Sequence, residues 1–261
     1  MRSLSIASTG MLAQQLNVEV ISNNIANLST TGFKRQRAEF QDLLYQNLRR
    51  IGSSSSDAGT IVPSGVQVGI GVRTGATYRI TEQGNLTSTS NPFDVAVQGR
   101  GYFRIQLPGG GDAYTRAGSF QLSATGQLVT QDGYLVQPNI TIPAGATDVS
   151  IDATGQVQAK IAGQVAPQVA GQLTLVNFFN EAGLESIGDN LFLETPASGG
   201  PTIGPAGSTG FGTIKQGFLE TSNVNPVQEI TDLITAQRAY EMNSKVITTS
   251  DEMLAQINQL H

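Results

Sequence analysis

The chain has 261 residues, a formal net charge of −5 and an isoelectric point near 4.9. Nucleic acids are bound through clustered Lys and Arg, so this charge indicates that nucleic acid is not a partner. No apolar run reaches the roughly 18 residues that span a bilayer, so we expect no direct membrane insertion. The absence of Cys excludes disulfides, thiolate metal sites and Cys nucleophiles.

The placement of Gly and Pro divides the sequence into parts. Only Gly10 and Gly32 precede Lys34, no Gly follows Gly217, and all Pro lie between residues 63 and 226. Helix-breaking residues are therefore concentrated in the middle, which predicts an α+β fold with a helix at each end and an all-β antiparallel centre. We expect these boundaries: helical segment 1–34, extended connection 35–65, β domain 66–220 and helical segment 221–261.

The first helix is predicted from Ser3 to Leu28. Two apolar columns repeat every seven residues along it, as in a coiled coil. The members expected to form an interface are Leu4, Met11, Val18, Ile21, Ile25 and Leu28. A helix of this length spans ~39 Å at 1.5 Å per residue. We expect it to stop before Gly32, which can adopt the positive φ of a helix C-terminal cap.

The second helix is predicted to begin at Asn225-Pro226 and to run for about 30 residues, because Pro suits the first helical position. Its apolar face is wider than a two-stranded seam needs, which favours more than one neighbour. Its interface candidates are Leu233, Tyr240, Val246, Ile247, Met253 and Leu254. Together the two helices would form a coiled-coil-like domain. The alternative is an intramolecular helical hairpin packed on the β centre, and the helices would then need no partner chain.

The centre shows alternating apolar and polar residues typical of strands, as in Phe93 to Val97 and Tyr102 to Ile105. Gly-containing turns separate these runs, for example at Ala124 to Gly126 and Asp132-Gly133. The polar stretch Ile51 to Thr60 is predicted to be an extended connection. The Gly-rich and Pro-rich stretch Ala197 to Gly212 is predicted to be an exposed loop.

The sequence offers little material for catalysis. The single His is the last residue, His261, so a Ser-His-Asp triad or a His metal site is not expected, and no cofactor is expected either. Carboxylates could still supply an acid and base pair for glycan cleavage. The candidates are Asp94, Asp112, Asp132 and Asp152. Turn chemistry accounts for most of them, so we expect no enzyme, and a glycan-cleaving activity is kept only as an alternative.

Three runs of residues carry a family resemblance. The run Asn23 to Lys34 resembles the signature that closes the N-terminal helix of bacterial flagellar rod and hook proteins. The runs Glu220 to Asn225 and Gln237 to Glu241 resemble its C-terminal counterpart, and Asn91 to Phe103 resembles the family's centre. The signature residues are Asn23, Asn24, Asn27, Thr31, Gly32, Phe33, Lys34, Ser222, Asn223, Asn225, Arg238 and Tyr240.

Within that family, the segment from Arg35 to Pro63 resembles distal rod subunits most, with proximal rod and hook-type subunits as alternatives. The resemblance implies a structural protein whose helices line a hollow helical polymer while the β domain faces outward. It implies a rod in the periplasm, built from subunits exported without a cleaved signal peptide. The implied partners are further copies of the chain, proximal rod proteins, the hook protein, the surrounding outer rings and the flagellar export apparatus.

Overall fold

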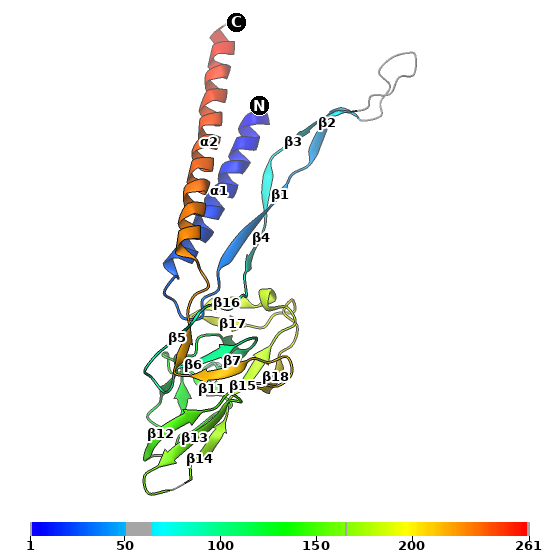
Figure 1. The fold of residues 1–261 in the computed structure, drawn as a ribbon. Helices are drawn as coiled ribbons and strands as arrows, with labels where there is room; N and C mark the ends of the chain where they lie inside the picture. The colour runs from blue at the N-terminus through cyan, green and yellow to red at the C-terminus, as the bar shows by residue number, and fades with distance from the viewer. Residues whose placement is uncertain (1, 51–63, 165, 260–261) are drawn as a thin grey trace. The chain divides into compact units, whose positions relative to one another are not determined.

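The computed structural model describes residues 2–50, 64–164 and 166–259. The fold is α+β, as predicted, with one long helix near each end of the chain and a large β-rich region between them in the sequence (Figure 1). The chain divides into two compact units, and each is built from discontinuous segments. Unit 1 comprises residues 1–25, 36–78 and 226–261, and unit 2 comprises residues 26–35 and 79–225.

Unit 1 holds both helices, α1 (Arg2–Ala26) and α2 (Pro226–Gln259). The start of α2 at Pro226 confirms the predicted beginning of the second helix. The end of α1 was predicted two residues too late: the helix stops at Ala26, and turns follow to Gly32. Gly32 does adopt a positive φ of 69°, but its role is a close approach, since an added Cβ would lie 2.9 Å from the Ala117 nitrogen.

Unit 1 also contains a two-stranded arm in the region that was expected to be an extended connection. Its strands are β1 (Gln36–Asp42), β2 (Tyr45–Arg49), β3 (Val66–Gly69) and β4 (Val72–Arg79). Strand β1 pairs with β4, and β2 pairs antiparallel with β3. The expected connection from Ile51 to Thr60 lies outside the described residues. Every residue of β2 is exposed, so this part of the arm has no apolar core of its own.

Unit 2 is the β-rich region, and its strand pairs are antiparallel, as predicted. The largest sheet has the order β16-β17-β8-β7-β11-β10-β9, with β15 joining β7 to β18. Its strands are β7 (Tyr102–Gln106), β8 (Asp112–Thr115), β9 (Gln121–Leu122), β10 (Leu128–Val129), β11 (Leu135–Gln137), β15 (Thr174–Asn177), β16 (Glu185–Gly188), β17 (Leu191–Leu193) and β18 (Thr202–Pro205).

Three smaller sheets complete unit 2. Their strands are β12 (Ala146–Ile151), β13 (Gln156–Ile161) and β14 (Gln168–Gln172) in one, β6 (Val95–Gln98) and β19 (Thr213–Gln216) in the second, and β5 (Leu86–Ser88) and β20 (Phe218–Glu220) in the third. A short 3₁₀ helix, η1, spans Glu181–Gly183. The predicted turns near Gly126 and Gly133 are confirmed, since both glycines have positive φ.

The core of unit 2 is one apolar cluster with a smaller aromatic cluster beside it. Phe103, Ile105 and Leu175 are fully buried in the first, and Phe103 packs edge-on against Phe120 with ring centroids 5.1 Å apart.

The prediction of an exposed loop in unit 2 was wrong. The stretch Ala197 to Gly212 is not a simple exposed loop, because β18 lies within it and pairs with β15, and Ser198 and Ala206 are buried.

Candidate assembly sites

The two helices of unit 1 lie side by side and run antiparallel (Figure 1). The Ser250 hydroxyl lies 3.3 Å from the Ser3 hydroxyl, and the Asn24 amide donates to the Glu229 carboxylate at 3.1 Å. Between these contacts, a Cβ on Gly10 would lie 3.0 Å from the amide nitrogen of Asn243. In each of the three pairs the residue numbers add up to 253, so the antiparallel register is constant along the pair.

These contacts are separated by seven and fourteen residues on both helices, so they follow a seven-residue repeat. On α2 the same spacing includes Ala236, which is buried, and the register places Asn17 opposite it. The seam between the helices therefore includes small and polar side chains at these positions. Small residues let two helices approach closely, and the buried Asn24 amide also donates to the Gln36 carbonyl at 2.8 Å, which ties α1 to the start of β1.

The apolar residues that the sequence suggested as an interface lie to either side of this seam. On α1 only Ile21 is buried, while Leu4, Met11, Val18 and Ile25 are half-buried, as is Leu28 beyond the helix end. On α2 the side chains of Leu233, Ile247 and Leu254 are half-buried, whereas Tyr240, Val246 and Met253 are exposed. The helix pair thus leaves much of the predicted apolar face of α2 without an intramolecular partner.

A groove with a volume of about 520 Å³ opens between the helices. Val18 of α1 and Tyr240 of α2 line this groove, and Glu19 and Glu241 are its charged lining residues. Two residues from the predicted interface therefore meet in one surface depression. Arg238, a signature residue on the same helix, is exposed.

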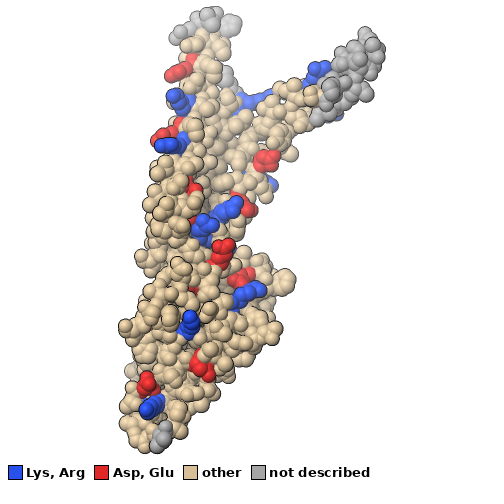
Figure 2. All heavy atoms as spheres, in the orientation of Figure 1, with Lys and Arg blue, Asp and Glu red and all other residues tan. Residues whose placement is uncertain are grey.

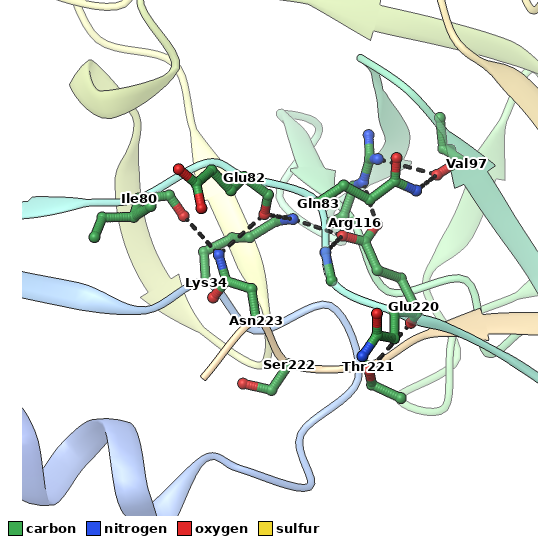
Figure 3. Close-up of polar contacts among 12 residues, drawn as sticks. Lys34, Ile80, Glu82, Gln83, Val97, Arg116, Glu220, Thr221, Ser222 and Asn223 are labelled. Atoms are coloured by element: carbon green, nitrogen blue, oxygen red, sulfur yellow. Dashed lines mark hydrogen bonds and ion pairs between the residues drawn. The ribbon is translucent and has the colours of Figure 1, made fainter. Parts of the chain in front are cut away.

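The signature residues Lys34, Ser222 and Asn223 lie in unit 2 at or near a buried carboxylate, Glu220 (Figure 3). One oxygen of Glu220 accepts a hydrogen bond from the Lys34 ammonium at 2.6 Å, and the other accepts from the Arg116 guanidinium at 2.6 Å. The backbone N–H of Gly84 also donates to this carboxylate at 2.9 Å. All three charged side chains are buried, so a carboxylate here balances two cations that have little contact with water.

The positive groups are satisfied by backbone carbonyls as well. Lys34 donates to the Glu82 carbonyl at 2.8 Å, and Arg116 donates to the carbonyls of Val97, Gly99 and Gly101. Burial acts to raise the pKa of Glu220, but the attraction of Arg116 and Lys34 and their hydrogen bonds outweigh it and hold the pKa below its ordinary value. Burial lowers the pKa of Lys34, and pairing with Glu220 opposes that change.

Asn223 joins the chain segments around this network. Its side-chain oxygen accepts from the Arg35 N–H at 2.7 Å, and its amide nitrogen donates to the carbonyls of Ile80 and Glu82, both at 3.0 Å (Figure 3). Its own N–H reaches the Phe33 carbonyl at 3.4 Å, and Gly32 donates to the Glu220 carbonyl at 2.8 Å. One amide side chain therefore ties together the segment after α1, the segment after β4 and the segment before α2.

The other signature residues lie in turns or near the ends of the helices. In the turn after α1, the Thr30 hydroxyl donates a hydrogen bond to the Asn27 side chain at 3.0 Å. In the segment before α2, the Ser222 hydroxyl accepts from the Val224 N–H at 3.3 Å. Thr31 and Phe33 are half-buried in the same turn region. Asn23 and Asn225, near the ends of the two helices, are exposed. Sequence reasoning missed Arg116, because no motif marks it and its partners are distant in the sequence.

Three of the four carboxylates that were considered for catalysis have local structural partners, and the fourth, Asp132, is exposed. Asp94 is buried and accepts from the Asn91 amide at 2.9 Å, and Asp112 lies 3.6 Å from the Arg104 guanidinium. The Thr154 hydroxyl donates to Asp152, which lowers the pKa of that carboxyl.

Within the described residues, no helix has both the length and the apolar character to cross a membrane. Figure 2 shows side chains of both charge signs interspersed on the visible face.

Known proteins match this chain along most of its length. Residues 4–34 match the family model described as flagella basal body rod protein. Residues 96–159 match the flagellar hook protein FlgE/F/G D1 domain, and residues 215–260 match the flagellar basal body rod FlgEFG protein C-terminal model. All three models describe rod and hook proteins of the bacterial flagellum.

Whole-chain relatives narrow this class. The chain is 63% identical over 260 residues to the flagellar basal-body rod protein FlgG of Caulobacter vibrioides, covering 100% of this chain and 99% of that protein. It is 56% identical over 259 residues to FlgG of Agrobacterium fabrum, covering 99% of each chain. It is 41% identical over 265 residues to FlgG of Bacillus subtilis, covering 100% of this chain and 99% of that protein. The chain belongs to the FlgG family of flagellar basal-body rod proteins, which are structural proteins and not enzymes.

Proposed function

We propose that this chain is a self-assembling subunit of the distal rod, the part of the flagellar drive shaft that lies in the periplasm. Copies of the chain form a hollow helical polymer that transmits torque and conducts exported subunits. The observation that carries this proposal is the full-length identity to FlgG proteins from several bacteria, combined with an apolar face on α2 that the chain itself does not cover.

The helices supply the contacts between copies in this proposal. Tyr240, Val246 and Met253 are exposed on α2, and covering a Val or Met side chain contributes about 1.5–3 kcal/mol. Many such contacts acting together suit a shaft that must not yield under load. Contacts between unlike surfaces of successive copies also generate open helical polymers when the rotation between copies does not close a ring. A coiled-coil arrangement of α1 and α2 with the helices of neighbouring copies is part of this proposal.

The remaining partners follow from the position of a distal rod. Proximal rod proteins lie below it, the hook protein lies above it, and outer ring proteins surround it. The export apparatus delivers the subunits, which keep their N-terminal segment because no signal peptide is cleaved. Proximal rod and hook-type subunits belong to the same structural class, but the whole-chain relatives favour the distal rod.

Electron cryotomography of basal bodies in cells that lack this gene tests the proposal. A short rod without a hook is expected. A full-length rod without a hook would instead indicate a hook-type subunit, and normal motile flagella would contradict any axial role. Reintroducing the wild-type gene must restore full-length rods, which excludes an effect on neighbouring genes.

A further inference from the structure

Unit 2 presents one large apolar side chain entirely to solvent. Phe179 is 100% exposed, whereas its neighbour Phe178 is only 2% exposed. Phe178 packs edge-on against Tyr114 with ring centroids 4.8 Å apart, and against Tyr102 at 6.2 Å. An isolated exposed Phe is unfavourable in water, because a Phe side chain gains about 1.5–3 kcal/mol when it is covered.

The backbone around Phe179 is held firmly, so the side chain protrudes from a fixed turn. The Asn180 N–H donates to the Ser198 carbonyl at 3.2 Å, and the Asn180 amide donates to the Ala197 carbonyl at 3.1 Å. Ser198 is fully buried, and its hydroxyl donates to the Thr195 carbonyl at 2.8 Å. On the other side of Phe179, Asn177 pairs with Thr202, and Phe178 already occupies the aromatic cluster.

The same unit contains a pocket that a phenyl ring could fill. It has a volume of about 540 Å³ and lies between the β9–β10 turn and the segment that leads into β12. Its apolar lining comes from Pro92, Phe93, Leu122, Ile142, Pro143 and Val149. An apolar cavity of about 150 Å³ is sufficient to hold a benzene molecule, so this pocket has room for the ring of Phe179 together with part of its backbone.

Charge and area both favour a further copy of the chain as the partner. Asp148 is the charged residue among those that line the pocket. Arg100 pairs with Glu181, which follows Phe179 by two residues in the sequence, and 65% of the Arg100 side chain remains exposed. Burying one aromatic side chain removes roughly 150–250 Å² from water, whereas stable interfaces bury about 1,200–2,000 Å². This contact is too small to hold two free proteins together, so it needs copies that other contacts already hold side by side.

We propose that Phe179 of one copy inserts into the pocket of the next copy in the assembled rod, with Arg100 close to Asp148 of that neighbour. The surface around Phe179 and the pocket are different surfaces of the chain, so the contact runs head to tail and can repeat without closing a ring. The inference rests on the proposed rod function and adds to it a specific contact between β-rich units, independent of the helices.

Cysteine cross-linking in assembled rods tests this contact. The chain contains no Cys, so a Phe179→Cys/Ala144→Cys variant carries a single reactive pair, with Ala144 on the pocket lining. Basal bodies are purified from cells that express the variant, oxidised and separated without reductant. We expect a ladder of cross-linked multimers that disappears on reduction. A band at monomer size that migrates as an internal cross-link would show that the pocket takes Phe179 of its own chain, which overturns the proposal.

Two controls make the result specific. Each single-cysteine variant must give no ladder, and Phe179→Cys/Val169→Cys, with an exposed residue on β14 outside the pocket lining, must cross-link at least about tenfold less. Full-length rods that show no ladder with the pocket pair would overturn this inference and leave the rod function intact. If wild-type chains fail to build rods, the proposed function itself fails.

A second variant removes the ring without adding a thiol. Truncating an aromatic side chain at an interface weakens the contact by more than tenfold when the residue is an energetic centre of that interface. We expect rods of Phe179→Ala to dissociate in acid at least about five times faster than wild-type rods, and Phe179→Leu to be intermediate. The exposed control Val169→Ala should dissociate at the wild-type rate. Equal rates for all four chains would contradict the proposal.

Discussion

At the scale of single residues, the most constrained group is the Glu220 carboxylate. It lies between Lys34 and Arg116, and all three side chains are buried. Taking such charges out of water is unfavourable, and only close pairing with complete hydrogen bonding offsets it. The network meets that condition, since the Gly84 N–H and four backbone carbonyls satisfy the remaining donors and acceptors. Removing one of these three charged side chains should therefore lower the stability of the fold strongly, because the remaining charges stay buried without their partner.

We expect Glu220→Gln to lower the free energy of unfolding by about 3–5 kcal/mol at neutral pH, because two buried cations lose their counter-charge. Denaturant unfolding of the full chain measures this effect. Glu185→Gln, on an exposed strand, is the matched control and should change the value by less than about 0.5 kcal/mol. A loss no larger than the control's would mean that the buried cations are solvated by other means.

The same variant should change how stability depends on pH. The folded-state pKa of Glu220 lies below the ordinary value of about 4.3. The stability that it contributes is therefore complete above that pH and is lost as the pH falls toward the folded-state pKa. Wild-type protein should lose stability between about pH 5 and pH 3 more steeply than Glu220→Gln. The acid loss due to Asp152, whose pKa is also lowered, remains in both chains.

Sequence patterns identified some of these residues but not their arrangement. Lys34 and Asn223 were found through motifs near the helix ends, and the structure brings both to the Glu220 network. Arg116 was missed because it enters from a strand end about a hundred residues away, and no local pattern marks a long-range ion pair. The candidate roles of the apolar helix residues remain predictions.

At the scale of elements, periodicity together with the stop signal at Gly32 and the start signal at Pro226 located the predicted helix ends within two residues. It could not reveal the face that joins α1 to α2. That seam uses Ser3, Gly10 and Asn24, which no search for apolar columns would select. Composition also misled at β18, where Gly and Pro predicted a loop although pairing with β15 gives a strand.

The exposed face of α2 gives a prediction that separates folding from assembly. The double variant Val246→Ser/Met253→Ser removes two exposed apolar side chains and should change the unfolding free energy of the monomer by less than about 1 kcal/mol. It should weaken the association of each added copy by at least about tenfold, so rods become short or absent. Chemical denaturation and electron microscopy of basal bodies measure the two effects.

Thr235→Ser, also on the exposed side of α2, is the control for small changes in helix propensity and should leave rods unchanged. Wild-type rods from the double variant would show that this face does not lie between copies. Loss of monomer stability similar to that of a core variant would instead show that the face is covered within one chain.

At the scale of the whole molecule, both compact units are assembled from segments far apart in the sequence. Unit 1 takes its strands from residues 36–78 and its helices from near the two ends of the chain. Its arm of β2 and β3 is a two-stranded pair with exposed side chains, including Tyr45 and Leu48. Two-stranded ribbons are marginally stable alone, so we expect the arm to gain stability from contacts with other copies.

The segment between β2 and β3 leads to a prediction about the stiffness of the assembled rod. We hypothesise that residues 51–60, which connect β2 to β3, help to make the rod straight and stiff through contacts with neighbouring copies. Deleting residues 51–60 should give rods that bend more, with a lower persistence length in electron micrographs. Replacing the same ten residues by Gly and Ser keeps the length and should bend similarly if specific contacts matter. Rods of unchanged stiffness in both variants would contradict the hypothesis.

The constant antiparallel register of α1 and α2 has a consequence for how the chain matures. Ser3 and Ser250 are separated by 247 positions in the sequence, yet their hydroxyls meet. Ribosomes make the N-terminal segment first, so α1 must wait without its partner helix until nearly the whole chain exists. A prematurely terminated product would never form this pair. Pairing of the two helices therefore requires a chain that extends through α2.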